Sequence, residues 1–179
     1  MTNTECSSSG EPRWQAVRSV ALPCFEWTGF GHRLVALGEH SERPGQVNRL
    51  WGAGRSLHYA PDRWLIPLPA PSTLEELERA ANAGGGVLTE VSGKWLLIRV
   101  AGAAIAGAAQ AEPSTTPLAA GFAKELVLKD RDCAALWLFD CPVIVSRDAP
   151  DLEIWLEASY EASFLSTLDS LGIVFPDSD

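Results

Sequence analysis

The clearest strand pattern in this 179-residue sequence is CAALWLFDCPVIVSRDAPDLEIWLE, which runs from Cys133 to Glu157. Its apolar and β-branched residues form three runs, separated by two short polar turns. These runs predict strands over Cys133–Phe139, Val143–Arg147 and Leu152–Leu156, the first two paired as a hairpin.

A helix is expected directly after this stretch. Ser159 is a typical N-cap residue, and Gly172 is a typical helix stop, so the segment between them predicts a helix as far as Leu171. Four apolar residues keep helical spacing on the face expected to be buried: Phe164, Leu165, Leu168 and Leu171.

Upstream, a second hairpin and a second helix are predicted. Ser56–Ala60 and Trp64–Leu68 read as strands joined by a turn at Pro61-Asp62. Ser72, three residues before Glu75, forms a capping box that starts a helix.

A glycine run at residues 84–86 ends that helix. Val87–Val91 and Trp95–Val100 then predict another strand pair, folded back around Ser92-Gly93.

The order of predicted elements is ββα, ββα, βββα, which favours an α+β fold with largely antiparallel sheets and helices packed on one face. Residues 1–12 are polar and Ser-rich, and we expect a disordered tail there. Residues 13–50 predict an irregular N-terminal arm, and residues 51–175 the α+β domain.

The chain carries a net charge of −9, and residues 130–179 account for it, with 11 carboxylates against Arg131 and Arg147. An acidic surface repels phosphate backbones, so we expect no nucleic-acid partner. The charge either serves solubility or meets a basic patch on another protein.

The longest apolar run, Trp95 to Ala109, is interrupted by Arg99 and is shorter than the roughly 20 residues of a membrane span. The N-terminus has no cationic segment followed by an apolar one, which is the pattern of a signal peptide. We therefore expect a cytoplasmic protein without a membrane partner.

The four cysteines, Cys6, Cys24, Cys133 and Cys141, form no Cys-x-x-Cys pair. A structural zinc site usually contains such a pair, so we expect no Cys-based metal site. Free thiols are expected, with Cys133 and Cys141 buried in strands.

Four motifs in order resemble the gamma subunit of heterotetrameric sarcosine oxidase. They are the hairpin at residues 56–66, the strand and helix start at 91–103, the hairpin at 133–145, and the strand and helix cap at 152–160. The last of these, Leu152-Glu-Ile-Trp-Leu-Glu-Ala-Ser-Tyr160, is similar to the family's F-E-L-x-V-x-R-S-Y. In the first hairpin, Ala60 and Arg63 replace the family's Gly and Glu.

The resemblance implies a fold like the folate-binding half of glycine-cleavage T-proteins. It also implies a place beside alpha, beta and delta subunits in a flavoenzyme. That complex oxidatively demethylates sarcosine or a similar N-methyl amine and passes the one-carbon unit to tetrahydrofolate. FAD, FMN, NAD and tetrahydrofolate would then lie on the partner subunits, and this chain would bind no cofactor.

No catalytic constellation emerges from the residues themselves. His32, His40 and His58 are scattered, and each reads as a surface or satisfied histidine. The carboxylates of Asp148, Asp151 and Glu153 flank a turn, and we expect them to stay solvated. We assign no catalytic, cofactor-binding or metal-binding residue.

The seven tryptophans divide into two groups. Four lie in predicted strands and are expected in the core: Trp64, Trp95, Trp137 and Trp155. Tryptophan and arginine are enriched at interface centres. The N-terminal tryptophans and nearby arginines are therefore predicted to contact a partner subunit, namely Trp14, Trp27, Trp51, Arg33 and Arg55.

Two functions stay open. The first is a noncatalytic structural subunit of a sarcosine-oxidase-like complex. The second is a stand-alone folate- or pterin-binding module for one-carbon transfer.

Overall fold

A computed structural model describes eight segments of the chain, and the architecture below refers to them. These segments are residues 14–19, 23–29, 44–49, 55–67, 74–100, 128–148, 151–170 and 173–174.

The first of two sheets has six strands among the described residues, in the order β11-β1-β7-β10-β9-β8. Its pairs are antiparallel except β1 with β11, which is parallel. The strands are β1 (Trp14–Ser19), β7 (Trp95–Val100), β8 (Cys133–Leu138), β9 (Cys141–Asp148), β10 (Asp151–Glu157) and β11 (Ile173–Val174).

The second sheet has five strands in the described segments, in the order β3-β4-β5-β2-β6, and every pair is antiparallel. The strands are β2 (Cys24–Thr28), β3 (Gln46–Arg49), β4 (Arg55–Ala60), β5 (Arg63–Pro67) and β6 (Val87–Glu90).

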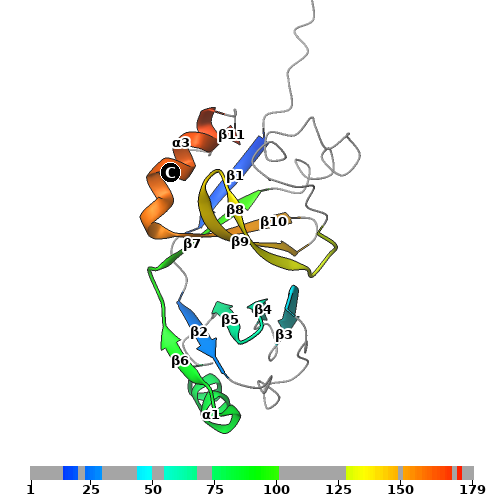
Figure 1. The fold of residues 1–179 in the computed structure, drawn as a ribbon. Coiled ribbons are helices and arrows are strands. Elements are labelled where there is room, and N and C mark those ends of the chain that lie inside the picture. Colours follow the sequence, from blue (N-terminus) through cyan, green and yellow to red (C-terminus); the bar gives the residue numbers. More distant parts are fainter. Residues whose placement is uncertain are drawn as a thin grey trace, which may run out of the picture.

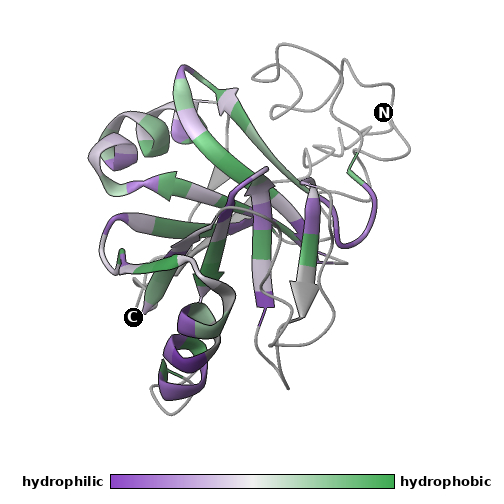
Figure 2. Cartoon of the chain, turned by 60° about the horizontal axis from the view of Figure 1, so that its bottom comes forward, coloured by the Kyte–Doolittle hydropathy of each residue, from purple (hydrophilic) through white to green (hydrophobic). Residues whose placement is uncertain are grey.

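The two sheets face each other, and each carries one described helix on its outer face (Figure 1). Helix α3 (Glu161–Ser170) follows a 3-10 turn at Ala158–Tyr160 and places Phe164 and Leu168 on the six-stranded sheet. Helix α1 (Leu74–Gly84) places Leu77 and Ala81 on the five-stranded sheet, and its exposed positions are mostly hydrophilic (Figure 2). The α+β class with antiparallel sheets is thus confirmed.

Between the sheets lies a separate apolar core. Leu57 and Leu65 of the five-stranded sheet pack there against Leu97, Ile144 and Trp155 of the six-stranded sheet. Because side chains alternate between the two faces of a strand, β5 and β10 each fill this central core with one face and pack toward a helix with the other.

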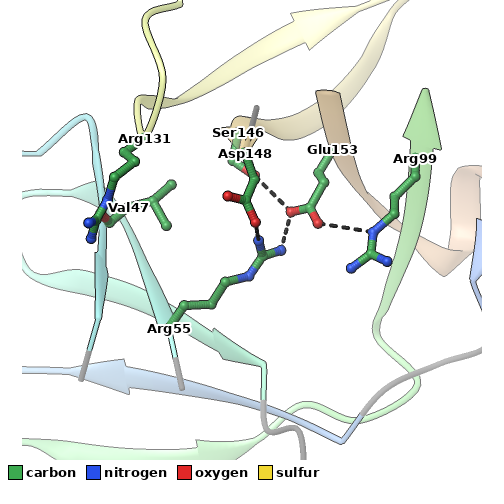
Figure 3. Close-up of polar contacts among 7 residues, drawn as sticks. All are labelled: Val47, Arg55, Arg99, Arg131, Ser146, Asp148 and Glu153. Atoms are coloured by element: carbon green, nitrogen blue, oxygen red, sulfur yellow. Dashed lines mark hydrogen bonds and ion pairs between the residues drawn. The ribbon is translucent and has the colours of Figure 1, made fainter. Parts of the chain in front are cut away.

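The sheets are also joined through their backbones at one edge. Val47 N donates to Arg131 O at 2.8 Å, and Cys133 N donates to Gly45 O at 2.9 Å. Arg131 adopts a positive φ of 65°, and its guanidinium also reaches Val47 O at 3.4 Å (Figure 3). The start of β3 therefore lies against the start of β8.

Both hairpins predicted from the sequence are confirmed, as β4–β5 and β8–β9. The predicted pairing of Val87–Val91 with Trp95–Val100 is wrong, although both strands exist. Strand β6 pairs with β2 in one sheet, whereas β7 pairs with β1 and β10 in the other. The residues between them cross from sheet to sheet instead of forming a hairpin turn.

The sequence predicts an irregular arm over residues 13–50, with short strands near Val17–Leu22 and Leu34–Leu37. The described segments of this range supply β1, β2 and β3, and β2 lies inside the five-stranded sheet between β5 and β6. These short strands are stabilised by partners far away in sequence, which local patterns do not reveal. The predicted tail at residues 1–12 lies outside the described residues.

Three of the four tryptophans predicted in the core are buried there, namely Trp64, Trp95 and Trp155. The prediction is wrong for Trp137, which is 65% exposed on β8. This strand is an edge of its sheet, and the central core does not extend over Trp137.

Candidate functional site

A buried carboxylate, Glu153, lies between the two sheets and is the centre of the main polar cluster in the described part of the chain. It is 1% exposed. The strand registers place it directly opposite Arg99 of β7 on one side and Ser146 of β9 on the other. The three side chains thus form a row across neighbouring strands.

Three donors bind this carboxylate (Figure 3). Arg99 Nε donates to Oε1 at 3.1 Å, and Ser146 Oγ donates to Oε2 at 3.2 Å. The third donor is Nη2 of Arg55, which reaches Oε2 from the opposite sheet. Glu153 therefore lies between two guanidinium groups, one from each sheet.

Arg55 is held on three sides. Besides Glu153, it binds Asp148 through Nη1 at 3.1 Å, and its guanidinium carbon lies 5.9 Å from the ring centroid of Trp155. Its side chain is only 18% exposed, whereas that of Asp148 is 64% exposed. The structure places this predicted interface residue in an ion pair within the chain.

The prediction that Asp148, Asp151 and Glu153 stay solvated is wrong for Glu153. Strand alternation puts Glu153 on the same face as Trp155, which is the face of the central core. The sequence contains this signal, because a charged residue with the phase of a buried tryptophan is expected to have a buried partner.

The chemistry of the cluster is that of a neutralised ion pair. A carboxylate that accepts from two arginines and a hydroxyl has few lone pairs left to bind a further ligand. Two positive and two negative side chains cancel, since Arg55 and Arg99 face Asp148 and Glu153. This arrangement joins the sheets.

Two buried thiols, those of Cys24 and Cys133, are held in their protonated form. Burial raises the pKa of Cys24 to about 12 and that of Cys133 to about 12. A thiol is nucleophilic as its thiolate, so neither group is activated near neutral pH. The predicted burial of Cys133 and Cys141 is confirmed.

A second polar cluster lies on the five-stranded sheet, where Tyr59, Arg63 and Glu26 meet. Arg63 Nη1 is 3.7 Å from Glu26 Oε1. Burial, and then the charge of Glu26, raise the pKa of the Tyr59 hydroxyl. The hydrogen bond with Tyr59 raises the pKa of the exposed Arg63. The phenol is thus held in its protonated form.

His58 lies in β4 and is fully buried. Its ring stacks on Trp64, with centroids 4.1 Å apart and an interplanar angle of 15°. It belongs to the packing of the sheet.

The predicted interface residues are not brought together in the described segments. Trp27 is fully buried against Trp64, so it does not occupy the surface position that a partner contact requires. The reason is that β2 is an inner strand whose outer face is covered by α1. The backbone of Trp14 lies in β1, while Arg33 and Trp51 lie outside the described residues.

No three His, Cys, Asp or Glu side chains in the described segments gather as metal ligands would. Within the same segments, no helix is long and apolar enough to cross a membrane.

The fold has counterparts among solved structures. A chain of the heterotetrameric sarcosine oxidase from Corynebacterium sp. U-96, solved in complex with pyrrole 2-carboxylate, matches with a TM-score of 0.70 at 16% identity. The match covers 88% of this chain and 82% of that chain.

The glycine cleavage system aminomethyltransferase T from Bartonella henselae matches with a TM-score of 0.61 at 14% identity. This match covers 91% of the present chain and 47% of the aminomethyltransferase, so the chain spans about half the length of that protein. No family model matches the sequence, and neither does any curated protein.

At these identities the likeness shows the fold. The chain has the α+β architecture found in aminomethyltransferases and in one chain of a heterotetrameric sarcosine oxidase.

Proposed function

We propose that this chain is a noncatalytic assembly subunit of a sarcosine-oxidase-like flavoenzyme, equivalent to the gamma subunit. The observation that carries the proposal is the two-way match with a chain of the heterotetramer, 88% of this chain against 82% of the other. The corresponding match with the aminomethyltransferase covers only 47% of that protein.

The chemistry of the described residues supports a noncatalytic role. Glu153 is neutralised by Arg55 and Arg99, and the thiols of Cys24 and Cys133 are held protonated by burial. None of these groups is prepared for proton transfer or nucleophilic attack.

In this proposal the alpha, beta and delta subunits bind FAD, FMN, NAD and tetrahydrofolate. Together the subunits oxidise sarcosine or a similar N-methyl amine in the cytoplasm. This chain contributes surface and stability to the complex.

The test is co-expression with the neighbouring genes, followed by purification through a tag at the C-terminus. We expect a stoichiometric complex with a flavin absorbance spectrum and amine-dependent reduction of the flavin. A chain that is purified alone at 19.3 kDa from such a co-expression overturns the proposal.

A second candidate is a folate-binding module, which the likeness to the aminomethyltransferase favours. A pterin ring presents N–H donors that a buried carboxylate would accept. Glu153 is the buried carboxylate of the described residues, and its oxygens already accept from two arginines and Ser146. These residues therefore do not fit a pterin. Calorimetric titration with tetrahydrofolate distinguishes the candidates, because the subunit role predicts no heat of binding to the isolated chain.

A further inference from the structure

We infer that the outer edge of β8 between Ala135 and Trp137 receives an extended segment of a partner subunit, which pairs with it as an additional strand. The inference rests on the proposed function, since it names the surface by which this chain joins the complex. Four observations on the described residues lead to it.

The first observation is the direction of the backbone groups. Cys133 N donates outward to Gly45 O, while Asp132 O accepts inward from Arg147 N of β9. Backbone groups alternate sides along a strand, so the N–H and C=O groups of Ala135 and Trp137 also point outward. Strand β8 is the edge of its sheet, and none of the described strands pairs with it there.

The second observation is that β3 ends its pairing just before this point. Gln46 bridges Asp132, but Gly45 adopts a positive φ of 101° and Pro44 has no N–H to donate. Among the described residues, the contact of β3 with β8 therefore ends at this point, and none of the described strands continues along the edge from Ala135 onward.

The third observation is the character of the exposed side chains. Trp137 is 65% exposed and Ala135 is also exposed, whereas Leu136 and Leu138 of the same strand pack toward α3. Proteins usually protect a strand edge with charges or proline, and a large apolar residue there favours strand pairing. Tryptophan is also enriched among residues that dominate binding energy.

The fourth observation concerns charge. The β8–β9 turn carries an exposed Asp140, two residues before Pro142, which is the β9 partner of Trp137. A segment of complementary chemistry would place an apolar side chain on Trp137 and a lysine or arginine near Asp140. Main-chain hydrogen bonds would supply affinity, and the Trp137 contact would supply specificity.

Two substitutions test the inference, each with a matched control. Trp137→Lys adds charge and removes the apolar contact. Its control is Val87→Lys, because Val87 is equally exposed, at 65%, on the edge strand of the other sheet. Ala135→Pro removes an outward N–H without breaking a bond to β9. Its control, Ala134→Pro, removes an inward N–H and is expected to lower the melting temperature instead.

The measurement is the dissociation constant of the complex formed on co-expression, together with the melting temperature of each isolated variant. We expect Trp137→Lys and Ala135→Pro to weaken assembly at least tenfold with little change in melting temperature. Val87→Lys is expected to leave assembly within twofold of wild type. Assembly of both test variants at wild-type affinity overturns the inference and leaves the proposed function standing.

Two other outcomes are distinguishable. If the wild-type chain forms no complex, the proposed function fails and this inference fails with it. If the isolated wild-type chain doubles in mass with concentration, and Trp137→Lys abolishes the doubling, the edge pairs with a second copy. That result overturns the assignment to a partner subunit.

Discussion

The substitution Glu153→Gln tests whether the inter-sheet ion pair holds the fold together. It keeps the size of the side chain and removes its negative charge, so that Arg55 and Arg99 lose their shared partner. The side chain of Arg55 is 18% exposed and that of Arg99 is 51% exposed. The loss of stability that follows from removing their partner is therefore larger at Arg55 than at Arg99.

The magnitude follows from these exposures. Breaking a buried ion pair by removing one partner costs about 3–5 kcal/mol, because a buried charge is left uncompensated. Arg55 keeps its ion pair with Asp148. The loss of stability that arises at Arg55 is therefore near the lower end of this range, at about 3 kcal/mol. Arg99 is half exposed and regains water, so its share is below about 1 kcal/mol.

We therefore expect Glu153→Gln to reduce the free energy of unfolding by about 3–4 kcal/mol. For a chain of this size, the corresponding fall in melting temperature is roughly 6–15 °C. Urea titration of the purified chain at pH 7 measures the free energy, and Arg99→Gln is the control, with an expected loss below about 1 kcal/mol.

A double-mutant cycle isolates the pair. Arg55→Met and Glu153→Met are each expected to destabilise, whereas the double variant places apolar groups together and recovers much of the loss. A Glu153→Gln loss below about 1 kcal/mol, or additive losses in the cycle, would refute the reasoning that this pair joins the sheets.

Two further predictions concern packing and pH. A Cβ at Gly86 would lie 2.2 Å from the Trp27 ring, so Gly86→Ala is expected to cost about 1–3 kcal/mol in urea titration. The control is Gly85→Ala, whose Cβ meets no atom within 4 Å, and it is expected to cost only the roughly 1–2 kcal/mol of a left-handed φ. Equal losses of unfolding free energy in the two variants, with an unchanged Trp27 environment, would contradict the packing argument. The folded-state pKa values of Cys24 and Cys133 are raised from 9.0 to about 12, so the stability that their protonated forms contribute is present below pH 9.0 and is lost as pH rises toward about 12. Urea titrations at several alkaline pH values should show a shallower loss in the Cys24→Ala, Cys133→Ala variant, and an unchanged slope would contradict this assignment.

The hairpins could be predicted because their partners are neighbours in sequence. A turn at Pro61-Asp62 and a two-residue turn at Phe139-Asp140 fold each strand back on the next one. Phe139 and Asp140 both adopt positive φ, at 50° and 59°, as this kind of turn requires. Local chemistry is sufficient for such pairs.

The sheets could not be assembled in the same way. Trp95–Val100 pairs with Trp14–Ser19 and with Asp151–Glu157, both more than 50 residues away. Alternation identifies which residues share a face of a strand, but it does not name the strand beside it. The sequence therefore predicts β6 and β7 correctly as strands and assigns them the wrong partner.

The same limit explains why the sequence predicts the exposure of Glu153 and Trp137 wrongly. Strand alternation places Glu153 on the same face of β10 as Trp155, and Trp137 on the same face of β8 as Cys133. Both faces point toward the opposite sheet. Whether such a position is covered depends on where the opposite sheet ends, which is a property of the assembled fold. Glu153 lies where Arg55 reaches across, whereas Trp137 lies on the edge strand β8, beyond the bridge between Gln46 and Asp132.

These two positions also indicate where this chain can act on other molecules. Its principal internal polar cluster is neutralised by its own members, and burial raises the pKa of the Cys24 and Cys133 thiols. What the described surface offers is a strand edge with outward backbone groups and an exposed tryptophan. A fold that supports catalysis in one protein can serve assembly in another when its inner groups bind each other, because function resides in the site and not in the fold. In the proposed subunit role, the edge of β8 receives the partner segment, and replacement of Trp137 is expected to weaken assembly while leaving the stability of the chain unchanged.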